Sequence, residues 1–418
     1  MDVHYYQQED RFYASDLPHL TMQPVDRLPA DAQLTWLFSR DPRDCRSSFC
    51  VSDERQLFAK SEDIRFLDPG RISARLPLLP RRLQRRIEAR TLQAVNIRHP
   101  LWQESRRICP EAPLTRKRVH LLGLGDVGGA LLTGLKTLGW DCISAIGIYD
   151  LNSSLVQRWV AETSQISWPW DYNVPPKVEA IGPEQLFDCD VFLFAATKSV
   201  PAVGSEVADV RMAQFEANRK IVEEYARQAR RAGFRGLFGI LSDPVDPLCR
   251  AAYAASNQDE DGSWDNRGLL AEQIHGFGLG VMNARAADLA GKDSRFTDFL
   301  RDGRSFGPHG RGLVIANSIE HYDDAISQEL TAQTLAANLR IREMGYKPFV
   351  APALSSGVFQ LLLLLRSQWH CASVCLGGVW IGCRNRYTSC GLETEALSMP
   401  DALFARLLET EKDLHAIT

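Results

Sequence analysis

A chain of 418 residues can bury a large core and is long enough for two or three domains. Its composition, 45% hydrophobic and 24% charged with a formal net charge of −4, is ordinary for a soluble globular protein and excludes both disorder and bulk attraction to nucleic acid. The N-terminus has no basic region followed by an apolar run, so we expect no secretory signal and a cytoplasmic location.

The first 115 residues are predicted to form an extra N-terminal domain. Apolar runs at 34–40, 47–53 and 64–70 are bounded by turn residues, which predicts strands of a small β-rich domain ending near Gly70. The segment 81–95 then predicts a helix with arginines on its outer face and an apolar face made of Leu83, Ile87, Thr91 and Val95. An arginine face is most often solvated, and the alternative is that it holds an acidic peptide or nucleic acid.

From about Thr115 apolar strands alternate with amphipathic helices. Four segments are predicted strands, at 118–124, 142–150, 189–197 and 236–246. The segment between the last two, 215–233, has the period of a helix. This alternation is typical of a doubly wound parallel sheet, so the fold class is expected to be α/β.

The most apolar run of the chain, 357–382, does not predict a membrane span. It is interrupted by polar side chains that would be costly in lipid, namely Gln360, Arg366, Gln368 and His370. The run therefore predicts a buried helix followed by a buried strand.

The ten cysteines have no regular spacing, which favours reduced thiols that act as small core residues. The strongest metal alternative combines His370 with the cysteines of the C-terminal region, which are Cys371, Cys375, Cys383 and Cys390. Because these cysteines alternate with apolar residues and include no CxxC pair, no metal site is expected.

A glycine-rich turn predicts a nucleotide site. Gly123, Gly125 and Gly128 form GxGxxG directly after a predicted strand and directly before a helix. In this motif the first glycine permits the turn, the second lets the backbone approach a pyrophosphate, and the third lets the helix pack on the strand. Further cofactor contacts are expected from the residues Asp126, Val127 and Ala195.

The next predicted strand ends on Asp150, where a carboxylate can accept hydrogen bonds from both ribose hydroxyls of NAD. No arginine follows in "YDLNSS" to bind the 2′-phosphate of NADP. We therefore expect NAD, with NADP as the less favoured cofactor.

At this point the sequence resembles the NAD-dependent lactate/malate dehydrogenases, 2-hydroxyacid dehydrogenases with an N-terminal Rossmann half and an α+β substrate half. The motifs run in the family's order from about Arg118 onward: "CDVFLFAAT", "RMAQFEAN", "LSDPVD", "GFGLGVMNAR", "GPHG" and the closing segment from "VCLGGVWIG" to "LLETEKDL". The resemblance implies a Rossmann NAD-binding domain at 116–267 and an α+β substrate domain at 268–418. Residues 1–115 have no counterpart in the family.

The resemblance also implies roles for individual residues. His309 corresponds to the proton donor, Arg285 to the bidentate clamp on the substrate carboxylate, and Arg211 to the loop arginine that polarises the carbonyl. In the family's NPVD block the asparagine near substrate and nicotinamide ribose is replaced by Asp243.

The departures from the family are concentrated around His309. The aspartate that normally accepts a hydrogen bond from the histidine is replaced by Met282. We hypothesise that Asp243 reaches His309 from the other side and restores the negative charge. The family's GEHGD reads "GPHGR" here, and the added Arg311 would make the site more cationic.

The substrate pocket is expected to be roomy. The loop from Thr197 to Arg211 is longer than the family's usual stretch, so the specificity residue falls near Gly204 or Ser205, both small. On the opposite wall Ser355 and Ser356 are also small. Small residues on two walls predict a small-molecule carboxylate substrate with a bulky side chain rather than simple lactate.

Two further functions remain open. Met282 is also consistent with an NAD-binding regulatory or scaffold protein of weakened catalysis, whose residues 1–115 bind a peptide or protein partner. A third alternative, an NAD-dependent glycosidase, needs a metal site that "LSDPVD" does not supply. The resemblance also implies a homo-oligomer.

Overall fold

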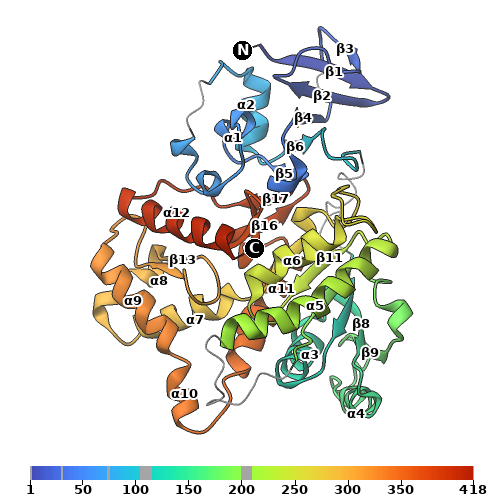
Figure 1. Ribbon diagram of the computed structural model, residues 1–418, viewed down its shortest axis with the longest axis vertical. Helices are drawn as coiled ribbons and strands as arrows, with labels where there is room; N and C mark the ends of the chain where they lie inside the picture. The colour runs from blue at the N-terminus through green and yellow to red at the C-terminus, as the bar shows by residue number, and fades with distance from the viewer. Residues whose placement is uncertain (1, 30–31, 73–75, 104–114, 199–209, 418) are drawn as a thin grey trace.

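The computed structural model describes the chain except residues 1, 30–31, 73–75, 104–114, 199–209 and 418 and the side chains at 210–213. Two large sheets organise the described part (Figure 1). No helix in these ranges is long and apolar enough to cross a bilayer.

The larger sheet has nine strands, six of them parallel. The parallel strands are β7 (Lys117–Leu122), β8 (Ile143–Tyr149), β9 (Lys177–Ala180), β10 (Val191–Phe194), β11 (Leu237–Ile240) and β12 (Ile274–Gly276). They lie in the order β9-β8-β7-β10-β11-β12. This is the Rossmann order, which reverses direction between β7 and β10, and ligands bind at the carboxyl ends of the strands there.

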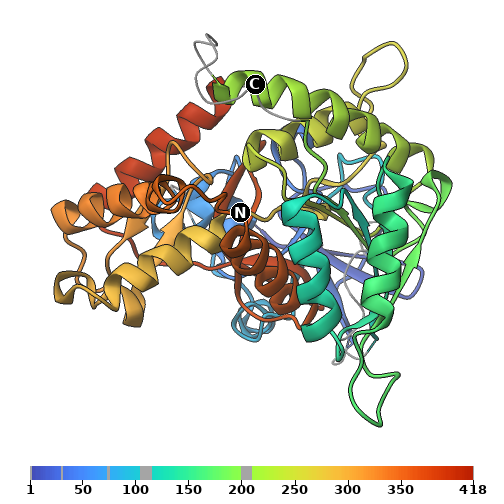
Figure 2. The same ribbon diagram turned by 90° about the horizontal axis from the view of Figure 1, so that it is seen from below.

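Helices cover both faces of the parallel strands. They are α3 (Asp126–Leu138), α4 (Ser153–Ser164), α5 (Val210–Arg231) and α6 (Val245–Ser256). Seen from below, α3 and α4 lie on one face of the sheet and the long α5 on the other (Figure 2). The α/β fold class predicted from the sequence is confirmed.

The C-terminal region extends the sheet with three antiparallel strands, β15 (His370–Leu376), β16 (Val379–Thr388) and β17 (Gly391–Thr394). The apolar run forms a buried helix and strand, as predicted: a π-helix (Pro352–Val358) continues into α11 (Phe359–Leu365), and β15 follows. The other α-helices and strands of the C-terminal region are α7 (Leu279–Ala290), α8 (Phe299–Asp302), β13 (Arg304–Phe306), β14 (Val314–Ala316), α9 (Asp324–Ala336), α10 (Leu339–Glu343) and α12 (Asp401–Ala416).

The N-terminal region forms a six-stranded sheet in the order β3-β1-β2-β4-β6-β5. Its strands are β1 (His4–Gln8), β2 (Arg11–Ser15), β3 (Gln23–Pro24), β4 (Leu34–Phe38), β5 (Ser48–Cys50) and β6 (Gln93–Asn96). The predicted strands in 34–40 and 47–53 are therefore present, and the β-rich character of the region is confirmed.

Two predictions for this region are wrong. The segment 64–70 contains two 3₁₀ turns instead of a strand, because the Asp63 carboxylate caps the first one by accepting from the Arg65 N–H and Pro69 starts the second. The helix predicted over 81–95 is α2 (Arg81–Glu88) and ends seven residues early. Arg90 then has a φ of 57°, which turns the chain into β6 between β4 and β5. Thr91 and Val95 thus belong to no helical face.

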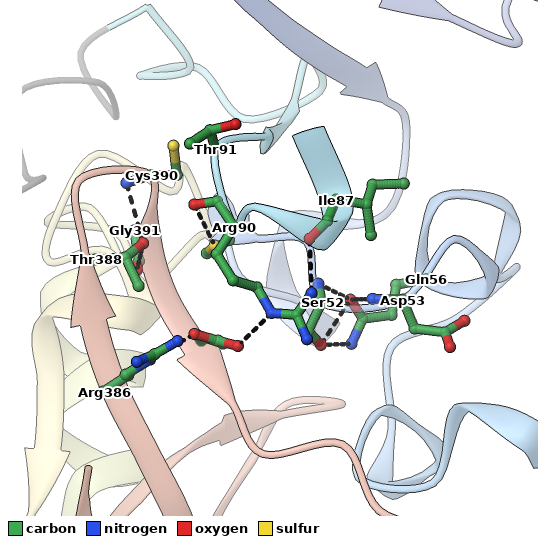
Figure 3. Close-up of polar contacts among 12 residues, drawn as sticks. Ser52, Asp53, Gln56, Ile87, Arg90, Thr91, Arg386, Thr388, Cys390 and Gly391 are labelled. Carbon is green, nitrogen blue, oxygen red and sulfur yellow. Dashed lines mark hydrogen bonds and ion pairs between the residues drawn. The ribbon is translucent and has the colours of Figure 1, made fainter. Parts of the chain in front are cut away.

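The N-terminal sheet is built into the rest of the molecule. The buried Glu393 of β17 accepts hydrogen bonds from Arg90 at 2.7 Å and from Arg386 at 2.7 Å (Figure 3). The buried Glu272 accepts from the backbone N–H of Ser47 at 3.0 Å and from the Ser48 hydroxyl at 2.9 Å. One hydrophobic core runs from the β4 and β5 side chains into those of β15 and β16. The N-terminal sheet is therefore fixed to the C-terminal strands.

Candidate active site

The glycine turn between β7 and α3 can be built only from glycine at two of its three positions. Gly123 has a φ of +94°, and a Cβ there would lie 2.7 Å from the Ala196 nitrogen. A Cβ on Gly128 would lie 2.0 Å from the Gly123 carbonyl oxygen. The first glycine therefore permits the turn and the third permits α3 to pack against it, as the motif requires.

The second glycine leaves open space. A Cβ on Gly125 would meet no atom within 4 Å. Gly125 is also the N-cap of α3, and no side chain caps the helix. The N–H groups of the first turn, which includes Asp126 and Val127, have no intrahelical partners, so the turn offers donors and space for an anion.

Asp150 and Ala195 flank this turn. Asp150 follows β8, and its carboxylate accepts from the Leu124 N–H at 2.8 Å and the Asn152 N–H at 2.9 Å. Both oxygens keep a second acceptor site, which suits ribose hydroxyls. Ala195 follows β10, and its methyl group is 3.9 Å from the Cβ position on Gly128. The predicted cofactor residues thus gather at the switch point of the sheet.

His309 lies in a loop between β13 and β14 that glycines allow. Gly307 and Gly312 have φ values of +87° and +88°. The imidazole Nδ1 is 3.0 Å from Oδ1 of Asp243, on the loop that follows β11. Asp243 in turn is held through its carbonyl oxygen, which accepts from the buried Asn218 side chain at 2.8 Å. The structure therefore brings together the histidine and the carboxylate that the compensation hypothesis requires.

The Asp243 charge determines the basicity of this histidine. Burial by itself would lower the pKa of His309, but the charge and hydrogen bond of Asp243 outweigh it, so the pKa is raised above its usual value. Arg285 opposes this effect because its positive charge is also close. The imidazole is consequently protonated over a wider pH range than a free histidine.

A buried carboxyl group holds the backbone of the histidine loop. Asp246, in the first turn of α6, accepts from the His309 N–H at 3.2 Å and from the Ser373 hydroxyl of β15 at 2.5 Å. Burial raises the pKa of Asp246 to about 6. Asp246 lies within the "LSDPVD" motif, but only the fold shows its contact with His309.

Arg285 and Met282 lie one helical turn apart on α7. Nη1 of Arg285 is 3.5 Å from Sδ of Met282, whose side chain is buried in an apolar cluster with Leu279 and Phe296. Burial lowers the pKa of Arg285, and the Asp243 charge opposes this. Met282 thus packs against Arg285, while Asp243 supplies the negative charge that acts on both Arg285 and His309.

Not every predicted site residue is placed at this centre. Ser356 is buried, and its hydroxyl bridges two backbone groups, donating to the Gly278 carbonyl and accepting from the Val281 N–H, each at 2.8 Å. Ser355, beside it in the π-helix, is partly exposed. Arg311 is 87% exposed and lies 4.0 Å from Asp413 of α12, so its charge is directed to α12, in contrast to the cationic site we expected.

The loop predictions lie outside the described residues. Gly204 and Ser205 fall in 199–209, and Arg211 is in the first turn of α5 with an undescribed side chain. A further residue near the turn was missed by the sequence analysis: Lys347, between α10 and the π-helix, has its Nζ 3.3 Å from Oδ2 of Asp126. In the described ranges no three histidine, cysteine or carboxylate side chains could hold a metal ion.

Comparisons with known proteins find lactate and malate dehydrogenases. No family model matches the chain. The L-lactate dehydrogenase of Streptococcus suis is 25% identical over 183 residues, which is 43% of this chain and 50% of that protein. The minor L-lactate dehydrogenase of Enterococcus mundtii superposes with a TM-score of 0.58 at 17% identity, over 72% of this chain and 97% of that one.

Over part of its sequence and over its fold, the chain is similar to proteins of the lactate/malate dehydrogenase superfamily. A malate dehydrogenase from Archaeoglobus fulgidus, solved with NADH, shares the fold of this superfamily with a TM-score of 0.55 at 14% identity, over 72% of this chain and 98% of that one. The chain spans about half the length of the curated lactate dehydrogenases it matches. The N-terminal region of this chain adds a six-stranded sheet to the nine-stranded one.

Proposed function

We propose that the protein is an NAD-dependent oxidoreductase that transfers a hydride between nicotinamide and a 2-hydroxy or 2-oxo acid. The observation that carries the proposal is the 3.0 Å contact between His309 and Asp243, which follows β11, with the positive charge of Arg285 close to the histidine. A protonatable imidazole, a carboxylate that holds it and a guanidinium for the substrate carboxylate are the groups that this reaction needs.

The described residues fit NAD. Gly125 has open space and uncapped helix N–H groups for the pyrophosphate, and Asp150 offers acceptors for the ribose hydroxyls. A carboxylate at that position disfavours the 2′-phosphate of NADP. When bound, the cofactor supplies hydride chemistry at the nicotinamide ring.

The chain's own residues then manage the substrate and the proton. Arg285 binds the carboxylate of the 2-oxo acid and orients its carbonyl. Asp243 accepts the hydrogen bond from Nδ1 of His309, which leaves Nε2 to donate its proton to the oxygen of the reduced carbonyl. Arg211, by the resemblance, polarises this carbonyl from the loop side. The small residues expected on the pocket walls, Gly204 or Ser205 on the loop and Ser355 on the opposite side, favour a substrate with a side chain larger than that of lactate.

Absorbance at 340 nm tests the proposal. Purified protein is titrated with NADH and NADPH and then mixed with 2-oxo acids ranging from pyruvate to bulky aromatic and dicarboxylic ones. We expect the protein to bind NADH tightly and to oxidise it with a bulky 2-oxo acid. The variant His309→Gln should keep the NADH affinity but lose the turnover. Rapid turnover of pyruvate at a micromolar KM would contradict the bulky substrate.

Binding of NADH without oxidation by any acid would instead favour the regulatory or scaffold alternative. In that case a peptide or protein partner of residues 1–115 would be the next ligand to test. Homo-oligomerisation stays a prediction that light scattering can check.

A further inference from the structure

An acidic side chain stands at the anion-binding end of α3. Asp126 is the first residue of this helix and directly follows Gly125, whose surroundings are open. A carboxylate is stabilised at a helix N-terminus by the free N–H groups, but it also repels a pyrophosphate that binds to the same groups. A nucleotide site with Asp126 therefore needs a compensating positive charge.

Lys347 supplies a positive charge at this position. Its Nζ is 3.3 Å from Oδ2 of Asp126, although the two residues are 221 positions apart in the chain. The π-helix that follows Lys347 packs directly along α3, since a Cβ on Gly134 would lie 2.5 Å from Cγ2 of Val358. The π-helix is thus packed against α3, and Lys347 precedes it by a short exposed segment.

The ion pair is solvent-exposed and weak. The Lys347 side chain is 84% exposed and the Asp126 side chain 52%. Exposed pairs of this kind contribute little to stability, so the ammonium group can turn toward a phosphate oxygen at small cost. The long lysine side chain and the open space beside Gly125 leave room for this movement.

We propose that Lys347 is a cofactor-binding residue that neutralises Asp126 and contacts the pyrophosphate of the dinucleotide. The inference rests on the proposed function, because it assigns a residue to the cofactor of that same site. Asp126 acts in the opposite direction: it holds the lysine when the site is empty and lowers the affinity for phosphate.

Calorimetric titration tests the proposal without any catalytic readout. The probes are NADH, ADP-ribose, which keeps the pyrophosphate but lacks nicotinamide, and adenosine, which lacks phosphate. Lys347→Ala is expected to lower the affinities for NADH and ADP-ribose about tenfold at low salt and to leave the affinity for adenosine unchanged. Asp126→Asn is expected to raise the affinities for NADH and ADP-ribose about threefold. The double variant should have affinities within about threefold of those of the wild type.

The matched control is Arg342→Ala, which removes an exposed cation of α10 five positions before Lys347. It should leave all three affinities unchanged. Equal affinities of wild type and Lys347→Ala for ADP-ribose would overturn the inference, as would an equal loss of affinity for adenosine, which lacks the pyrophosphate. Failure of wild type to bind NADH at all would instead overturn the proposed function.

Discussion

At the scale of single residues, Asp243 determines how His309 behaves. The raised pKa of His309 depends on the Asp243 carboxylate, because burial alone and Arg285 both lower it. In Asp243→Asn we expect the alkaline limb of the reduction profile to move to lower pH, and turnover at pH 7.5 to fall by about tenfold to a hundredfold. The measurement is kcat for 2-oxo acid reduction between pH 5 and 9.

The same group affects stability. A raised histidine pKa stabilises the fold below about pH 6.5, the unfolded value, and this contribution is lost as the pH rises through the folded value. Asp243→Asn should therefore reduce the unfolding free energy at pH 6 more than at pH 9. An equal loss at both pH values would show that Asp243 acts by packing alone.

Asp246 gives a second residue-scale prediction. Because burial raises its pKa to about 6, the folded state holds the proton more tightly than the unfolded chain, and stability falls as the pH rises from about 4 to about 6. Asp246→Asn keeps one acceptor for the His309 N–H and should flatten this fall, whereas Asp246→Ala loses both bonds and should cost about 1–3 kcal/mol. Urea unfolding at pH 4.5, 6 and 7 compares the three proteins.

At the scale of elements, the strand–turn–helix of β7 and α3 separates structural from ligand-facing glycines. Gly128→Ala places a Cβ on the Gly123 carbonyl and should destabilise the fold by several degrees in Tm. Gly125→Ala meets no protein atom, so its Tm should match wild type while NADH affinity falls by about tenfold or more. Thermal unfolding and calorimetry measure the two effects. Unchanged NADH affinity in Gly125→Ala would show that no ligand approaches this turn.

At the scale of the whole molecule, the N-terminal sheet and the C-terminal strands should unfold together. Glu393 is buried between two arginines of different regions, so Glu393→Gln should cost about 1–3 kcal/mol, less than a fully buried pair because both arginines are partly exposed. The control is Arg43→Ala, which removes an exposed ion pair with Asp41 and should be nearly neutral. Denaturation followed at separate N- and C-terminal probes should give one transition, and two transitions would support an independent domain at 1–115.

The sequence predicted those parts of the fold that short-range patterns determine. The glycine turn, Asp150 and the alternation of strands and helices follow from local spacing, and they appear as expected. The family's carboxylate is lost at Met282 and one is gained at Asp243, and this exchange predicted the contact between Asp243 and His309. In contrast, β6 is set by pairing with β4 and β5, and Lys347 reaches Asp126 through tertiary packing. No local pattern carries those contacts.

The joining of the two sheets has a consequence for synthesis on the ribosome. The Ile64 N–H donates to the carboxylate of Glu411, 347 positions later in the chain, and Arg90 donates to the distant Glu393. At about 5–20 residues per second, translation of that interval takes roughly 20–70 seconds. During this time the emerging N-terminal strands expose Trp36 and Phe49, which are fully buried in the finished protein. Newly made chains should therefore depend on chaperones that shield apolar surface until the last helix has left the exit tunnel.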